Sequence, residues 1–152
     1  LSIFDQIVTF AGTTLTYKDV LENLNILDYE YYFKVMDAVE KEDISTSLLI
    51  LNDVFEKGFD GHHFVVGLAE HLRNLLVCKD ARTSNLLEVP ETVRQRFVEQ
   101  AKEIEAIHIM RALTILSKTD VDYKSAKNQR LLIEVALMQL CSLKQESEKK
   151  KD

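Results

Sequence analysis

Residues that interrupt helices are scarce in this sequence. Its 152 residues include one proline, four glycines and no tryptophan. So few turn-forming residues are typical of long helices joined by short loops, and they argue against a fold with many strands. Long apolar runs are missing as well, since none approaches the roughly 18 residues of a membrane-spanning helix. The first residues do not have the pattern of a signal peptide, so we expect none. We therefore predict an all-α protein with no membrane contact.

Positive charge and cysteine are also in short supply. The formal net charge is −6, with 19 Lys and Arg against 25 Asp and Glu. A domain that grips nucleic acid is usually basic, because phosphate neutralisation dominates that affinity, so we expect no direct contact with nucleic acid. Cys78 and Cys141 do not form a C-x-x-C pair, which excludes a zinc ribbon. Two isolated cysteines on apolar helix faces suit a reducing cytoplasm, the location we expect.

The longer part of the chain, from residue 28 onward, shows helical periodicity. Apolar residues recur there at spacings of three and four, which predicts a bundle of about five to six helices. Asp28, Asp43 and Asp60 are placed to cap the first turns of three of them. Gly58 suits the left-handed end of the second, and Pro90 suits a first helical turn.

The first 27 residues have a different pattern. Residues 1–11 read as the end of a helix, and Gly12 with the two threonines after it breaks that helix. Thr16 and Asp19 have the spacing of a capping box, which predicts a second short helix. Because the chain begins at Leu1 rather than at Met, we expect it to be a fragment of a longer protein.

The last predicted helix, residues 124–143, follows a loop at residues 120–122 and is apolar around nearly its whole circumference. Such a helix must be buried on all sides. Either a partner subunit covers one side, or the helix is the central one of its own bundle. Both remain open on this pattern. The charged residues 144–152 predict a disordered tail or linker.

Two charges interrupt the apolar surface of that helix. Arg130 and Glu134 are four residues apart, which allows an intrahelical ion pair. Alternatively, they orient the helix against a partner, because a charge on a buried helix is costly unless it is paired. The candidate partner interface is therefore Arg130, Leu131, Glu134, Val135 and Met138.

Motifs that carry chemistry are nearly absent. No glycine precedes a Lys-Ser or Lys-Thr pair, so the phosphate-binding loop of nucleotide-binding proteins is missing. His63, His71 and Cys78 are spaced by seven and eight residues, about 10–12 Å along a helix, which is too far for one metal ion. Asp120 and Asp122 lack the glycine and distal glutamate of a calcium loop. We expect no catalytic, metal or cofactor residue, although a small helical enzyme remains an alternative.

Four segments in order resemble one family. They are LSIFDQ at residues 1–6, VLENLNILDYEYYFKVMDAV at 20–39, KGFDGHHFVVGLAEHLRNLLV at 57–77 and RLLIEVALMQLCSL at 130–143. Together they are similar to the bacterial DNA polymerase III gamma/tau subunits, the ATPases of the sliding-clamp loader. The resemblance implies that residues 1–27 are the end of an AAA+ lid domain and that residues 28–143 form the third, collar domain.

This resemblance also implies a function. The collar holds gamma/tau copies together with the delta and delta-prime subunits in a five-membered ring that loads the clamp onto DNA. The family's ATP, magnesium and zinc sites lie upstream, so this stretch would assemble subunits and carry no catalysis. A generic helical adaptor, which binds an amphipathic partner helix in a groove, is the alternative function.

Overall fold

The computed structural model describes the backbone of residues 7–10 and 13–145 and the side chains of residues 29–145. The chain divides into two compact units, Leu1–Tyr32 and Phe33–Asp152. Residues 1–6, which carry the first resembling segment, and residues 146–152, most of the predicted tail, lie outside the described residues. The division into a lid remnant and a collar at residue 28 stays a prediction.

The first unit begins with a β-hairpin rather than with the predicted helix. Strands β1 (Ile7–Phe10) and β2 (Thr13–Thr16) pair antiparallel, with Ile7 opposite Thr16 and Phe10 opposite Thr13. The helix predicted over residues 1–11 is therefore wrong for this segment. Both strands consist largely of β-branched and aromatic residues, which favour strands. A glycine also stands between the two strands in the sequence, as is typical of a hairpin. These local preferences decided the structure over the apolar spacing, which also fits a helix.

Helix α1 (Tyr17–Glu40) is a single element of 24 residues. It begins directly after Thr16, as the capping box predicts. The helix start predicted at Asp28 is wrong, because α1 continues through that position. No glycine or proline occurs within α1, and an aspartate in a helix interior costs only a fraction of a kcal/mol, about 0.7 at most.

Helix ends in the second unit follow local sequence signals. Asp43 caps α2 (Ile44–Glu56) by accepting hydrogen bonds from the backbone N–H and the hydroxyl of Thr46. Gly58 follows α2 with a φ of 85°, as expected for a left-handed end. Asp60 caps α3 (Gly61–Val77) through the N–H of His62. These three predictions are confirmed.

The later elements differ in their bounds from the prediction. A one-turn helix, α4 (Ala81–Ser84), was not predicted. Pro90 immediately precedes α5 (Glu91–Glu103) instead of lying in its first turn. The loop predicted at residues 120–122 is still helical, because α6 (Ala106–Asp122) includes it. Helix α7 (Gln129–Cys141) begins five residues later than predicted, where the Asn128 side chain accepts a hydrogen bond from the N–H of Leu131.

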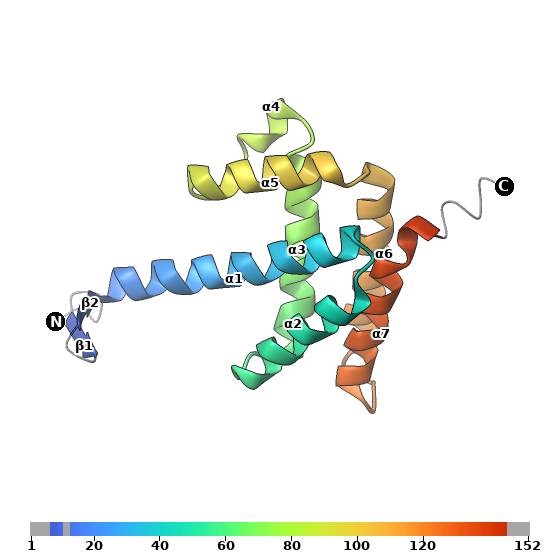
Figure 1. The fold of residues 1–152 in the computed structure, drawn as a ribbon, viewed down its shortest axis with the longest axis horizontal. Coiled ribbons are helices and arrows are strands. Elements are labelled where there is room, and N and C mark those ends of the chain that lie inside the picture. Colours follow the sequence, from blue (N-terminus) through green and yellow to red (C-terminus); the bar gives the residue numbers. More distant parts are fainter. Residues whose placement is uncertain (1–6, 11–12, 146–152) are drawn as a thin grey trace. The chain divides into compact units, whose positions relative to one another are not determined.

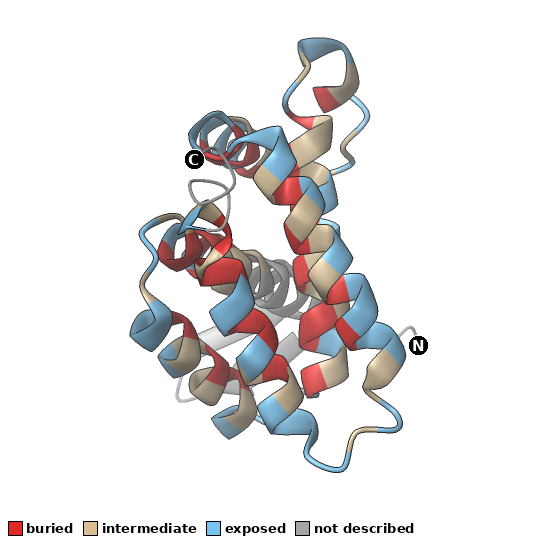
Figure 2. Cartoon of the chain, turned by 90° about the vertical axis from the view of Figure 1, so that its right-hand side faces the viewer, coloured by how far each residue is buried: buried red, intermediate tan, exposed pale blue. Residues whose placement is uncertain are grey.

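The core of the second unit is built around α3, which packs against α2, α5, α6 and α7 (Figure 1). Its inward face carries five wholly buried apolar side chains: Phe64, Val65, Leu68, Leu72 and Leu75. Figure 2 shows buried segments of several helices turned toward one another and exposed segments turned outward. Full burial of each such side chain contributes about 1.5–3 kcal/mol. The central position belongs to α3, so the alternative that the last helix is the central one is wrong.

The fold class is confirmed as an all-α bundle, with the β-hairpin as an addition at its N-terminal end. Seven helices occur in the part of the chain that the structure describes, whereas the sequence predicts about five to six in the bundle and two short ones before it. Among these residues, no helix is long and apolar enough to span a membrane.

Candidate partner-binding surface

Helix α7 has one face in the core and one face outside it. Its buried residues form the inward face and are Ile133, Ala136, Leu137, Leu140 and Cys141. This face packs against α2, α3 and α6. The contact with α3 is close, because the Cδ1 atom of Ile133 would lie 2.7 Å from a Cβ added to Gly61. Helix α7 is therefore fixed in orientation by the bundle.

The outward face of α7 carries an apolar stripe, which we call the α7 stripe. It consists of Leu131, Val135 and Met138, which are 51%, 41% and 37% exposed. Their spacing of four and then three residues places them on one line along the helix. All three belong to the interface that the sequence predicts. The bundle does not cover them, so a partner is required if the whole circumference is to be buried.

Arg130 is held against α2 beside this stripe. Its guanidinium Nη2 donates a hydrogen bond to the Oδ1 atom of Asn52 at 2.9 Å, and its Cζ atom lies 5.2 Å from the ring centre of Phe55. The structure shows no ion pair between Arg130 and Glu134, so the intrahelical pair is not formed. Arg130 therefore links α7 to α2 within the domain.

Glu134 is half-buried at the edge of the α7 stripe. Within the described residues its carboxylate has neither an ion pair nor a hydrogen bond. Its oxygens can therefore accept a hydrogen bond or an ion pair from another molecule.

A second set of exposed apolar residues, the α6 stripe, lies on the neighbouring helix and is interrupted by polar residues. It consists of Ile107 and Met110 near the start of α6 and of Val121 at its end, each at least half exposed; exposed Thr114, Ser117 and Lys118 lie between Met110 and Val121. The opposite face of α6 is buried in the core through Ile109, Ala112 and Leu116. The sequence did not predict these exposed residues as an interface. Apolar residues at helical spacing occur on both faces of α6, so periodicity alone does not distinguish the outer face from the inner one.

Buried polar contacts join α1, α3 and α5. The Nε2 atom of His71 and the Oε1 atom of Gln100 are 2.7 Å apart. The amide nitrogen of Gln100 donates to the carbonyl of Phe33 and to the Oδ1 atom of Asp37. Because that nitrogen is the donor, the Gln100 oxygen accepts and His71 donates through Nε2. Burial lowers the pKa of His71 to about 4, against the opposing effect of the hydrogen bond with Gln100.

The three residues that could be considered as metal ligands, His63, His71 and Cys78, do not come together in the fold. His63 is exposed, whereas His71 and Cys78 are buried. No group of three potential ligands occurs among the described residues. The carboxylate of Asp120 instead forms a hydrogen bond with Nε2 of His62, whose ring lies 5.1 Å from that of Tyr123. This cluster joins the start of α3 to the end of α6.

Both cysteines are free and buried. Burial raises the pKa of the Cys78 thiol and of the Cys141 thiol. The sulfur of Cys141 lies 3.8 Å from the hydroxyl oxygen of Ser47, in the contact between α7 and α2. A raised pKa and burial are properties of packing cysteines rather than of reactive ones.

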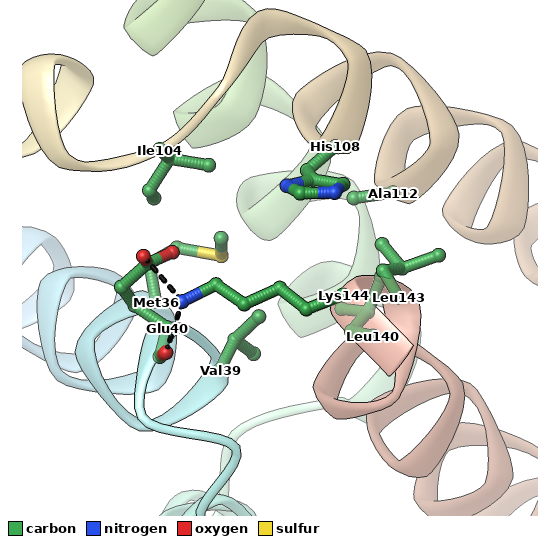
Figure 3. A pocket seen from close by; sticks show the side chains of 9 residues that line it. All are labelled: Met36, Val39, Glu40, Ile104, His108, Ala112, Leu140, Leu143 and Lys144. Carbon is green, nitrogen blue, oxygen red and sulfur yellow. Dashed lines mark hydrogen bonds and ion pairs between the residues drawn. The ribbon is translucent and has the colours of Figure 1, made fainter. Parts of the chain in front are cut away.

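Two cavities are lined by residues that the structure describes, and both are small or shallow. One lies where α1, α6 and the end of α7 meet, and Figure 3 shows Lys144 extending across it toward Glu40. Its Nζ atom donates to the carbonyl of Glu40 at 2.7 Å and lies 2.5 Å from the carboxylate. The enclosed space is about 20 Å³, room for about one water molecule. The sequence predicts Lys144 in the tail, but here it joins two helix ends.

A second, more open cavity of about 250 Å³ lies beside α4, between α3 and α5. Its lining is mainly small and aliphatic, with the stems of Lys79 and Lys102. The ammonium group of Lys79 is already bonded to the carbonyls of Ala101 and Ile104 at the end of α5. The α7 stripe, which lies outside both cavities, is the candidate surface for binding another molecule.

Comparison with known proteins gave three findings. The family model for DNA polymerase III subunits gamma and tau, domain III, matches residues 15–152. The DNA polymerase III subunit tau of Bacillus subtilis (strain 168) is 24% identical over 147 residues, which are 97% of this chain and 26% of that protein. The chain thus spans about a quarter of that relative. The Bacillus subtilis DNA clamp loader delta protein has a similar fold, with a TM-score of 0.67 at 18% identity over 80% of this chain and 40% of that one.

Proposed function

This chain belongs to the family of domain III of the DNA polymerase III subunits gamma and tau, and from that premise we propose that it joins subunits of the sliding-clamp loader. The observation that carries the proposal is the α7 stripe, an exposed apolar line on a helix that the bundle holds in a fixed orientation. A rigid apolar surface loses little entropy when a partner covers it.

The partners we propose are other gamma/tau copies and the delta and delta-prime subunits. The delta protein of the Bacillus subtilis clamp loader shares this fold, which supports contacts between like domains. The resemblance of residues 130–143 to the closing collar helix supports the same surface. Arg130 would contribute indirectly, because its bond to Asn52 positions the start of α7.

The α7 stripe alone supports only weak association. Each of its three side chains is roughly half exposed, so burying the remainder contributes about 1 kcal/mol each. A total of about 3 kcal/mol is less than the roughly 4 kcal/mol that corresponds to a millimolar dissociation constant. Further surfaces of the subunits must therefore take part in assembly.

The proposed role is structural and needs no cofactor in this stretch. We propose that catalysis and the ATP, magnesium and zinc sites belong to other parts of the parent protein, that the domain does not bind nucleic acid itself, and that it acts in the cytoplasm. The net charge of −6 supports the proposal about nucleic acid.

The test is light scattering of this chain alone and mixed with the delta and delta-prime subunits. We expect a discrete mixed assembly. Leu131→Glu places a charge in the α7 stripe and should reduce the assembled fraction. Leu86→Glu is the matched control, because Leu86 is 73% exposed and lies outside both stripes. An equal loss of assembly in both variants would contradict the role of α7.

The same experiment separates the proposal from the alternative function. A helical adaptor would bind a single amphipathic peptide at the α7 stripe and would ignore the folded subunits. A chain that stays monomeric in all mixtures, yet binds such a peptide, would therefore favour the adaptor.

A further inference from the structure

The open cavity beside α4 combines an apolar lining with positive charge. Its volume is about 250 Å³, and it lies where α4 and α5 meet the end of α3 (Figure 1). Part of the lining is aliphatic, from Ala81, Val98 and Ala101. Two lysines also line it, whereas no Asp or Glu is among its described lining residues. The cavity therefore offers an apolar space beside cations and away from carboxylates.

No described carboxylate neutralises either ammonium group at the cavity. Lys79 donates to two backbone carbonyls at the end of α5, so its charge faces carbonyl oxygens rather than an acid. Lys102 is exposed and forms neither a hydrogen bond nor an ion pair with a described residue. The nearby arginines, in contrast, are already paired with carboxylates, Arg82 with Asp80 and Arg94 with Glu91. This part of a protein with a net charge of −6 is thus locally positive.

The size of the cavity favours a side chain of a larger partner over a free small molecule. Pockets for small ligands usually measure about 300–1,000 Å³ and cover most of the ligand. This cavity is smaller and open to solvent. A single apolar side chain of a peptide can fill such a space while the rest of the peptide lies on the surface, as anchor residues of interfaces do.

The lining also favours a peptide over a nucleic acid. Proteins that bind single strands stack the bases on aromatic side chains, and no aromatic residue is among the described residues that line this cavity. Binding of a phosphate backbone usually takes several cations, whereas two are present here. An aliphatic lining beside two ammonium groups instead matches an apolar side chain with carboxylates next to it.

We propose that this cavity binds an acidic peptide of a partner protein. One large apolar side chain of the peptide is seated between α4 and α5, and a flanking carboxylate pairs with Lys102. Lys79 adds to the attraction while it holds the end of α5. No residue of α7 is among those described as lining the cavity. The site is therefore separate from the α7 stripe, and this inference does not depend on the proposed function.

Fluorescence anisotropy tests the proposal with a defined ligand, a short labelled peptide in which one phenylalanine is flanked by aspartates. We expect saturable binding to the whole chain at low salt, and weaker binding as the salt concentration rises. Two matched peptides separate the contributions, one with asparagines in place of the aspartates and one with serine in place of the phenylalanine. Each should bind about fivefold more weakly or worse. Equal binding of either peptide, or no binding of the first one, would overturn the inference.

Substitutions in the chain test the residues of the site. Lys102→Glu reverses the unpaired charge and should weaken binding about fivefold or more. Lys118→Glu is the matched control, because it makes the same change at an exposed lysine of α6 and should leave binding unchanged. Ala81→Phe fills the cavity from the exposed start of α4 and should weaken binding about tenfold. Circular dichroism and urea unfolding should match the wild type in all three. Equal affinity in the two lysine variants would refute the role of Lys102.

Amide chemical shifts locate the bound peptide on the wild-type chain without any substitution. The peptide should change the shifts of α4, of α5 and of the end of α3. Changes confined to α7 would place the peptide on the α7 stripe and overturn the inference. The same changes with a single-stranded oligonucleotide would show that charge alone is recognised, which would also overturn it. Leu131→Glu should bind the peptide like the wild type, so a failure of subunit assembly and a failure of this site are measured separately.

Discussion

Protonation of His71 should destabilise the second unit as the pH falls below neutrality. The side chain is 2% exposed and lies against the rings of Phe33 and Phe97. Burial lowers its pKa from 6.5 to about 4, the hydrogen bond with Gln100 acts in the opposite direction, and the charge of Arg96 lowers it slightly further. In the unfolded chain the imidazole takes up a proton near pH 6.5, whereas in the folded chain it stays neutral down to about pH 4.

The sign and size of the effect follow from this difference. Between the two pKa values the unfolded state binds more protons, so the free energy of unfolding rises with pH. The stabilisation is complete above pH 6.5 and is lost progressively as the pH falls toward 4. At about 1.4 kcal/mol for each pH unit, the full loss is about 3 kcal/mol, and about 2 kcal/mol of it falls between pH 7 and pH 5. That is a large fraction of the 5–15 kcal/mol typical of a domain.

Urea unfolding followed by circular dichroism at pH 7, 6 and 5 measures this loss. His71→Gln removes the titrating group and keeps a donor that can reach Gln100. This variant should be less stable than the wild type at pH 7, and its stability should change much less between pH 7 and pH 5. His63→Gln, on the exposed side of the same helix, is the matched control and should retain the wild-type pH dependence.

The test is the comparison of the pH dependence of stability among the three proteins, because every other titratable group contributes equally to all of them. Equal slopes in the wild type and in His71→Gln would refute the reasoning. They would show that His71 gains its proton without unfolding the domain around it.

Other changes probe the packing of α7 and the thiols. Gly61→Ala should lower the free energy of unfolding measured in urea, because the new Cβ would lie 2.7 Å from the Cδ1 atom of Ile133. Overpacking of this kind costs about 1–3 kcal/mol. That cost exceeds the up to ~1 kcal/mol that alanine gains over glycine in a helix. Asn128→Ala removes the cap of α7 and should cost about 1 kcal/mol in the same assay. Burial raises the pKa of Cys78 and of Cys141. A reagent that modifies cysteine thiols should therefore react slowly with the native protein at pH 8 and rapidly with the protein unfolded in urea. Fast native reaction at either thiol would contradict its buried position.

Much of the fold could be predicted because its signals are local. Asp43 and Asp60 act as caps through hydrogen bonds that span two or three residues, and Gly58 has the positive φ that its position suggests. The failures occur where two local signals compete. Asp28 looks like a cap, yet the residues on both sides favour helix and the chain continues without a break. Residues 7–10 have apolar spacing that fits a helix and side chains that favour a strand.

The candidate surface could be predicted only in part. The apolar circumference of α7 identifies Leu131, Val135 and Met138 as candidates, but it does not show which side the bundle covers. The link from Arg130 to Asn52 joins residues 78 positions apart, so the spacing of Arg130 and Glu134 pointed to the wrong partner. Long-range contacts of this kind depend on the packing of whole helices, which periodicity along one helix does not encode.

The bond between Lys144 and Glu40 has a mechanical consequence. These residues are 104 positions apart in the chain, and their contact joins the turn after α7 to the end of α1. A force applied to the chain beyond residue 145 would therefore be shared by α1 and α7 instead of acting on α7 alone. The hydrogen bond from Gln145 to Glu42 lies beside it and would carry part of the same load. A pulling force on residue 145 would therefore have to break the contacts with Glu40 and Glu42 before it could separate α7 from the core.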